Sequence, residues 1–194
     1  MAQTPVTPPE PPGDADLPTI GAWIARWLPI VGAASYSAIE GTGDFFARAS
    51  DSVTSVALRG CTLVLEERSV STAHGETLER WQAIRVPLAQ VDTTAVQPKI
   101  RRAGMLLGRP NVMLTGQMVV PLRSPSRTGF ITIVPRDPPA PDTLVAEHLV
   151  PFAFAVVPAE RSARAIRRAA GLCIALTERR EEHPSFDGPP VLGN

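Results

Sequence analysis

Cysteine and lysine are scarce in this chain of 194 residues, which contains two cysteines and one lysine. Cys61 and Cys173 are too few for a disulfide framework, and they do not have the spacing of metal ligands. We expect two buried free thiols in a reducing compartment, and a single bridge between the two cysteines is the alternative. Because Lys99 is the one lysine, arginine supplies the remaining basic side chains.

The sequence also lacks the short motifs of common active sites. It contains no GxSxG, no P-loop and no GxGxxG, and His74, His148 and His183 are not spaced as a metal pair. Glu147 precedes His148, but neighbours on a strand face opposite sides of a sheet, so the two make a poor acid–base couple. We therefore expect a protein that is not an enzyme and uses no cofactor and no metal. The alternative is a small hydrolase with dispersed catalytic residues, which a deep polar pocket containing His74 or His148 would favour.

Neither sign of charge is in excess overall, because 19 basic residues balance 19 acidic ones. This balance argues against nucleic acid as a partner. Between Thr93 and Arg136, however, one lysine and six arginines occur without any Asp or Glu, which gives the span a formal charge of +7. The charge is therefore distributed unevenly along the chain.

We expect the cations of this basic span to contact an anionic surface or a protein partner. The candidate binding residues are Lys99, Arg101, Arg102, Arg109, Arg123 and Arg127. The alternative is that these side chains are solvated in loops or pair across the sheet. Their partners would then be Glu66, Glu67, Glu76 and Glu79.

Proline and small polar residues fill both ends of the chain, where apolar residues are too few to build a core. We expect residues 1–18 to form a disordered proline-rich arm and residues 180–194 a disordered tail. The first residues include no basic stretch followed by an apolar one, as a signal peptide would, so we expect a cytoplasmic location.

Apolar residues recur at helical spacing after a candidate N-cap, Thr19. They are Ile20, Trp23, Ile24, Trp27 and Val31. We expect residues 19–50 to form an N-terminal helical segment whose apolar stripe packs on the domain or on a partner subunit. In the alternative, Trp23 and Trp27 anchor the helix at a membrane surface, which would make this a peripheral membrane protein.

The middle of the chain alternates apolar and polar residues as strands do. The strand candidates are residues 52–71 (a strand pair or one bent strand), 79–91, 111–123, 129–135 and 148–158. Gly60 marks a bend or bulge and residues 73–76 a turn, and Pro158 ends the last strand. Because no helix of crossover length separates most of these strands, neighbours should be antiparallel. Residues 98–111 are expected to be a loop or short helix.

A helix with two distinct faces follows from Ala159. Its apolar face contains Ile166, Ala169, Ala170, Cys173 and Leu176, and its basic face contains Arg161, Arg164 and Arg168. The apolar face needs a sheet beneath it, so we expect Ile166, Cys173 and Leu176 to be buried.

Six or seven antiparallel strands followed by this helix, with Trp81 opening one strand, resemble the pleckstrin-homology-like architecture. The resemblance covers roughly residues 52–178 and rests on the order of the elements. It implies a mainly β (α+β) fold, a bent sheet or partly open barrel closed by the C-terminal helix, and a domain over residues 51–179. It also implies a non-catalytic binding or scaffolding module, because such domains present loops and sheet edges to lipids, peptides or proteins.

Overall fold

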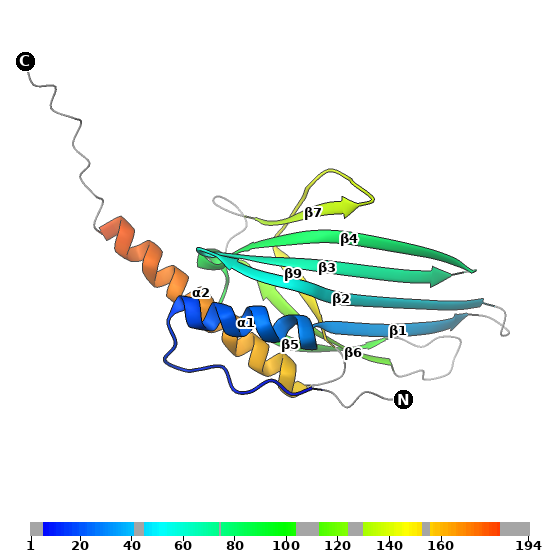
Figure 1. The fold of residues 1–194 in the computed structure, drawn as a ribbon, viewed down its shortest axis with the longest axis horizontal. Helices are drawn as coiled ribbons and strands as arrows, with labels where there is room; N and C mark the ends of the chain where they lie inside the picture. The colour runs from blue at the N-terminus through cyan, green and yellow to red at the C-terminus, as the bar shows by residue number, and fades with distance from the viewer. Residues whose placement is uncertain are drawn as a thin grey trace, which may run out of the picture.

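The structure is a computed structural model that describes residues 6–40, 45–73, 75–103, 113–123, 130–152 and 156–182. Figure 1 shows a sheet of long strands, a smaller sheet behind it, and two helices beside one end of the long strands. Both sheets are antiparallel. The mainly β architecture with an N-terminal and a C-terminal helix confirms the predicted fold class. Within the described residues, the strands form two separate sheets and no closed barrel.

The larger sheet has the strand order β1-β2-β3-β4-β7-β8, and the smaller sheet has the order β5-β6-β9. The strands of the larger sheet are β1 (Ala33–Glu40), β2 (Phe45–Arg59), β3 (Thr62–Ala73), β4 (Glu76–Pro87), β7 (Ile131–Asp137) and β8 (Thr143–Val145). Those of the smaller sheet are β5 (Gln97–Ala103), β6 (Met113–Pro121) and β9 (Glu147–Phe152). A short 3-10 helix, η1 (Leu88–Gln90), follows β4. The predicted turn at Gly75 is confirmed, and Gly60, which we expected at a bend or bulge, also lies in a turn. Both glycines have the positive φ that tight turns favour, 79° and 56°.

Two segments that we expected to be helical or irregular are strands. Residues 33–40, part of the predicted helical segment 19–50, form β1 and pair with β2. Residues 98–103, expected to be part of a loop or short helix, belong to β5, which pairs with β6. In both cases the segment pairs with the next strand along the chain, and its own periodicity does not report this pairing.

The N-cap of helix α1 (Leu17–Val31) is Asp16, about one turn before Thr19, the cap that we predicted. The side chain of Asp16, and not that of Thr19, caps the helix, because Asp16 Oδ1 accepts a hydrogen bond of 2.9 Å from the backbone N–H of Thr19. Gly32 ends the helix against β2, since a Cβ there would lie 2.6 Å from the carbonyl oxygen of Leu28 and 2.9 Å from a methyl group of Val53. This close approach places α1 directly on the long sheet.

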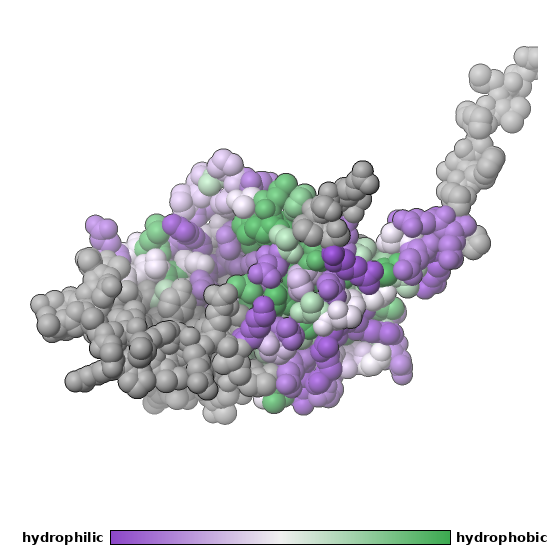
Figure 2. All heavy atoms as spheres, turned by 180° about the vertical axis from the view of Figure 1, so that it is seen from behind, coloured by the Kyte–Doolittle hydropathy of each residue, from purple (hydrophilic) through white to green (hydrophobic). Residues whose placement is uncertain are grey.

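Helix α2 (Val156–Glu182) is longer than predicted at both ends. It includes Pro158, which we expected to end a strand, because proline is tolerated in the first turn of a helix. Its last turns project beyond the sheets and are hydrophilic (Figures 1 and 2). Ile166 is buried as predicted, but Leu176 is 41% exposed and lies where the helix leaves the sheet. In the described part of the chain, neither helix combines the length and the apolarity that crossing a bilayer requires.

Cys61 and Cys173 form a disulfide, which corrects our expectation of two free thiols. Cys61 follows the β2–β3 turn and Cys173 lies on the buried face of α2, so the bridge ties the C-terminal helix to one end of the long sheet. The Cα atoms of the two residues are 5.5 Å apart although 112 residues separate them in sequence. Such a spatial relationship cannot be deduced from the spacing of two cysteines.

The core lies between the helices and the inner faces of both sheets. Its largest fully buried side chains include Ile20, Ile24 and Leu28 of α1, Leu63 and Leu65 of β3, Ile84 of β4, Met118 of β6 and Ile166 of α2. The bridged Cys173 belongs to the same cluster. One core therefore joins α1, α2 and the two sheets.

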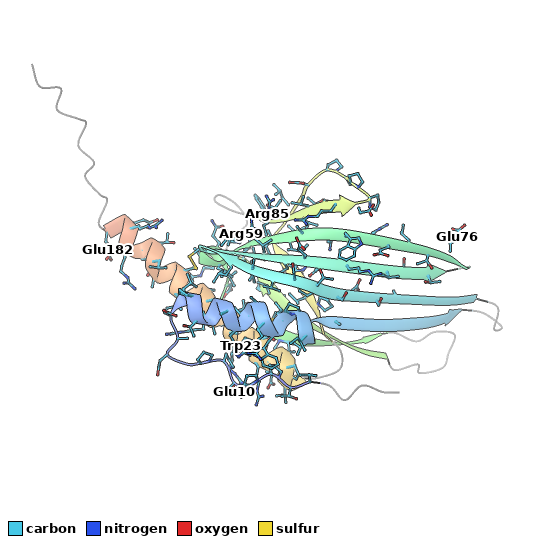
Figure 3. All side chains as sticks on the ribbon, viewed as in Figure 1. Glu10, Trp23, Arg59, Glu76, Arg85 and Glu182 are labelled. Carbon is cyan, nitrogen blue, oxygen red and sulfur yellow. A yellow bond between two sulfur atoms is a disulfide. The ribbon has the colours of Figure 1, made fainter. Side chains whose placement is uncertain are left out.

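The N-terminal arm contacts α2. Glu10 forms ion pairs with Arg161 and Arg164 at 3.0 and 2.9 Å, and the buried Pro8 accepts a hydrogen bond from Arg161 through its carbonyl oxygen. Figure 3 shows Glu10 on the segment that runs beside α2. We expected residues 1–18 to be a disordered arm, and the contacts of Pro8 and Glu10 with α2 were not predicted. The sequence did not indicate them because the arginines and Glu10 are about 150 residues apart, as the separations of 151 and 154 residues show.

Candidate functional site

The predicted basic surface is only partly within the described residues. Lys99 is exposed on β5, and Arg123 is exposed just after β6. Lys99 is the cross-strand partner of Gln117, and Arg123 lies six positions further along the chain, which corresponds to about 20 Å along a strand. These two cations therefore do not form one cluster.

Of the other four candidate binding residues, the structure describes the backbone of two, Arg101 and Arg102. Arg101 and Arg102 occupy adjacent positions on β5, and adjacent positions on a strand belong to opposite faces of the sheet. Their side chains, and the whole of Arg109 and Arg127, lie outside the described part of the chain.

Pairing across the sheet, the alternative interpretation of the basic span, is confirmed for one cation. Arg136, at the end of the span, forms an ion pair of 2.7 Å with Glu66 on β3. Arg123 also has an acidic neighbour, Asp92. The pKa of Asp92 lies below its ordinary value mainly because Thr94 donates hydrogen bonds to it from its hydroxyl and its backbone N–H, and the charge of Arg123 adds to the effect.

The apolar stripe of α1 packs on the domain, as we expected. Trp23 is only 8% exposed and belongs to the core that α1 shares with β2 and α2 (Figure 3). Trp27 is half-buried, and the guanidinium of Arg26 lies 5.1 Å from its ring centre. Membrane anchoring through Trp23 would require α1 to leave this core.

The outer face of the long sheet carries paired charges. Arg68 on β3 donates hydrogen bonds of 2.7 and 3.1 Å to the carboxylate of Glu79 on β4, and Trp81 donates one of 2.7 Å to the same carboxylate. These bonds lower the pKa of Glu79, with the hydrogen bonds from Arg68 as the largest cause and that from Trp81 next. Arg136 and Glu66 form a second ion pair on this face.

The inner face of β2, β3 and β4, which is the face toward the helices and the smaller sheet, changes from apolar to polar along its length. The strand register aligns residues of β2, β3 and β4 in successive rows. From the helix-covered end outward, these rows are Leu58–Leu63–Val86, Val56–Leu65–Ile84, Val53–Glu67–Gln82, Asp51–Ser69–Arg80 and Ala49–Ser71–Leu78. The first two rows belong to the core, and the polar rows begin where the helices end.

A groove of about 390 Å³ lies over the outermost two rows. We call it the inner-face groove and define it by its lining residues, Ala49, Asp51, Ser69, Val70, Ser71, Leu78, Arg80 and Gln82. Asp51 and Arg80 occupy the two ends of one row, with Ser69 between them. Two strand spacings, about 10 Å, therefore separate their backbones.

The two charges of the groove have no ion-pair partner within the described residues, unlike Arg68, Glu79, Arg136 and Glu66 on the outer face. Among the described residues, no ion pair or side-chain hydrogen bond involves Asp51 or Arg80. A carboxylate and a guanidinium on either side of a small residue can each bind one end of a ligand that carries both charges.

A buried polar group lies in the row directly next to this one. Glu67 on β3 and His148 on β9 are 2.7 Å apart, from Oε1 to Nε2, and the Gln82 side chain donates a hydrogen bond of 3.3 Å to the other carboxylate oxygen. The contact joins the larger sheet to the smaller one. Because Gln82 also lines the inner-face groove, the buried pair holds one wall of the groove in place.

This pair has part of the geometry of a catalytic dyad but lacks a nucleophile. Glu67, and not the adjacent Glu147, is the carboxylate that contacts His148, and 81 residues separate the two. Among the described side chains, no Ser, Thr or Cys is hydrogen-bonded to His148, and no group of His, Cys, Asp and Glu could hold a metal ion. His74 and His183 lie outside the described residues. The arrangement can therefore orient Gln82 and connect the sheets.

Sequence reasoning did not single out Asp51, Ser69 or Arg80. One signal was present: the turn at Gly75 sets the register of β3 and β4, which places Ser69 beside Arg80 and Glu67 beside Gln82.

Comparison of the chain with known protein families, curated proteins and solved structures finds no significant match.

Proposed function

We propose that the protein is a non-catalytic binding module that holds a small dipolar ligand, such as a short peptide with free termini, in the inner-face groove. The observation that supports this proposal is the row Asp51–Ser69–Arg80, in which two opposite charges without an ion-pair partner among the described residues line one groove. Asp51 would accept hydrogen bonds from the ammonium group of the ligand. Arg80 would donate two parallel hydrogen bonds to its carboxylate, a geometry that the planar guanidinium favours.

The dimensions of the groove fit a ligand of this size. An extended dipeptide is about 7 Å long, which is comparable to the backbone separation of about 10 Å between Asp51 and Arg80. The volume of about 390 Å³ lies within the range of small-molecule sites in proteins, about 300–1,000 Å³. Ser71 adds a hydroxyl group, and Leu78, which is 46% exposed, offers an apolar contact to a ligand side chain.

A binding role has more support than a catalytic one. His148 is buried against Glu67 and is not among the residues that line the groove. The resemblance to pleckstrin-homology-like domains also favours a binding or scaffolding role, by analogy of architecture alone.

Thermal unfolding with dipeptides and their blocked forms tests this proposal. A zwitterionic dipeptide at 100 times its Kd should add about 2.7 kcal/mol of stability, a rise in Tm of about 5–10 °C. N-acetylation of the dipeptide should lower its affinity for the native protein but not for Asp51→Asn. C-amidation should lower its affinity for the native protein but not for Arg80→Gln.

Arg85→Gln is the matched control, because Arg85 is an exposed arginine on the same strand and is not part of the groove. It should leave the affinity unchanged. The proposal is wrong if no dipeptide raises Tm, or if Arg80→Gln and Arg85→Gln weaken binding equally.

A second candidate function rests on strand β5, an edge of the smaller sheet. Exposed edges often carry lysine and proline because these residues oppose strand addition by other chains. Pro98 and Lys99 fit that protective role, whereas Arg101 and Arg102 add positive charge that would attract an anionic surface or an acidic protein. The edge therefore offers a contact region separate from the inner-face groove.

A further inference from the structure

Three arginines of α2 form a row along one face of the helix. Arg161, Arg164 and Arg168 are three and four positions apart, which places them on adjacent turns. Together they contact the N-terminal arm at three points. We call this row the arginine face of α2.

The three arginines bind the Glu10 carboxylate and two backbone carbonyl oxygens of the arm. Arg161 donates to the Pro8 carbonyl and, at 3.0 Å, to Glu10 Oε1. Arg164 donates to both oxygens of the Glu10 carboxylate, at 3.0 and 2.9 Å. Arg168 donates to the Ala15 carbonyl at 3.2 Å. The face therefore recognises one carboxylate and two backbone carbonyls of an irregular segment.

Two other arginines of the same helix show that this use is selective. Arg167 and Arg179 donate to the carbonyl oxygens of Ala163 and Ala175, one turn earlier in α2. Within the described residues, neither of them contacts the arm. The arm therefore engages a particular set of arginines and not the helix charge in general.

The arm is also suited to low-cost docking. Residues 8–12 have the sequence PPEPP, and proline fixes φ, so this segment loses little conformational freedom when it binds. Its ion pairs are partly exposed, however, since the side chain of Glu10 is 60% exposed in both. Ion pairs at such sites contribute little net stability, so a competing segment can displace the arm.

We propose that the arginine face of α2 is a docking site for an extended, proline-containing acidic segment of a partner protein, and that the arm occupies it in the isolated chain. The partner segment supplies a carboxylate in the place of Glu10 and a proline two positions before it, in the place of Pro8. The tether to α1 gives the arm a high local concentration at the face, on the order of millimolar. Partner binding must therefore compete with the arm.

A labelled peptide with the sequence of residues 6–16 tests this site by fluorescence anisotropy. In the full-length variant Glu10→Arg, the reversed charge repels Arg161 and Arg164 and should leave the face open. The peptide should bind this variant about tenfold more tightly than the native chain, because the tethered competitor has been removed. Binding should weaken as salt rises from 0.1 to 1 M, since screening shortens the Debye length from about 10 to about 3 Å.

The matched controls use arginines of the same helix. In the Glu10→Arg background, Arg161→Ser with Arg164→Ser should reduce peptide binding at least tenfold, whereas Arg167→Ser with Arg179→Ser should leave it unchanged. A peptide with Glu10 replaced by Gln should bind more weakly to the open variant. The proposal is overturned if the peptide does not bind Glu10→Arg, if it binds the native chain equally well, or if both arginine pairs matter equally. Circular dichroism spectra should confirm that every variant is folded.

Discussion

Glu67 on β3 and His148 on β9 lie 2.7 Å apart between the two sheets, with only 8% and 9% of their side chains exposed. Removal of one member should be costly, because the other would remain buried without its main partner. We expect His148→Ala to lower the free energy of unfolding by about 3–5 kcal/mol, measured by urea denaturation. Replacement of both residues by leucine should cost much less, since it leaves no buried polar group unpaired. Equal stability of His148→Ala and the native protein would contradict a structural role for the pair.

The disulfide between Cys61 and Cys173 should be a main source of stability. It closes a loop over a separation of 112 residues, for which the loss of chain entropy in the unfolded state corresponds to about 5 kcal/mol. We expect the double variant Cys61→Ser, Cys173→Ser to unfold at lower urea concentration, and the native protein with reducing agent to behave in the same way.

The number of free thiols provides a direct check of the bridge. The denatured, unreduced protein should contain no free thiol, and two would contradict the bridge.

Ile166 and Leu176 provide a matched pair on α2. Both were expected to be buried, but Ile166 is 1% exposed and Leu176 is 41% exposed. Ile166→Asp should lower the free energy of unfolding by several kcal/mol, because it places a carboxylate in an apolar core. Leu176→Asp should change stability by no more than about 1 kcal/mol. Similar losses in the two variants would show that the end of α2 is packed more tightly than the structure indicates.

The stability of the outer face should depend on pH through Glu79. Hydrogen bonds from Arg68 and Trp81 hold the pKa of Glu79 below its ordinary value of 4.5. The stabilisation from ionised Glu79 is therefore complete above about pH 4.5 and is lost as the pH falls through the lower pKa of the folded state. The Tm of the native protein should exceed that of Glu79→Gln near pH 7, and the difference should shrink toward about pH 3.

The partner residue supplies the control for this experiment. In an Arg68→Gln background, the further change Glu79→Gln should alter Tm with much less dependence on pH than it does in the native background. A difference that stays constant with pH in the native background, or that grows as the pH falls, would be inconsistent with the hydrogen bonds to Glu79.

Local patterns in the sequence predicted the parts of the fold that depend on local structure. The alternating residues of β2 and β3, the turns at Gly60 and Gly75, and the amphipathic α2 were all recognisable, because one face of each element must be buried. Strands β1 and β5 were missed because pairing with β2 and β6 stabilises them, and their own residues do not show a clear strand period. The disulfide was missed for a related reason, since it depends on how α2 lies against the sheet.

The candidate site was harder to predict because it depends on the register of three strands. The register of β3 and β4 follows from the turn at Gly75. That of β2 and β3 does not follow from the turn at Gly60 alone, because the register shifts between Val53 and Ser55. Without this irregularity, Asp51 would not share a face with Ser69 and Arg80. Charge counting along the sequence instead drew attention to the basic span, which the strand pairing spreads over distant positions.

Variants of the basic span distinguish a binding edge on β5 from solvated cations. We expect the quadruple change of Lys99, Arg101, Arg102 and Arg109 to serine to leave the fold intact, since exposed charges contribute little to stability. If this span binds an anionic partner, the variant should bind phosphatidylserine vesicles or RNA more weakly than the native protein. The difference should shrink as salt rises from 0.1 to 1 M, because screening removes the long-range attraction.

Two exposed arginines of the larger sheet, Arg59 and Arg85, provide the control for this charge effect (Figure 3). Arg59→Ser with Arg85→Ser removes positive charge outside the basic span and should weaken binding less per charge removed than the quadruple variant does. If both variants lose affinity in proportion to the charge removed, the effect comes from net charge and not from a site. If the folded quadruple variant binds vesicles and RNA as tightly as the native protein at low salt, these cations are solvated side chains and not a binding site.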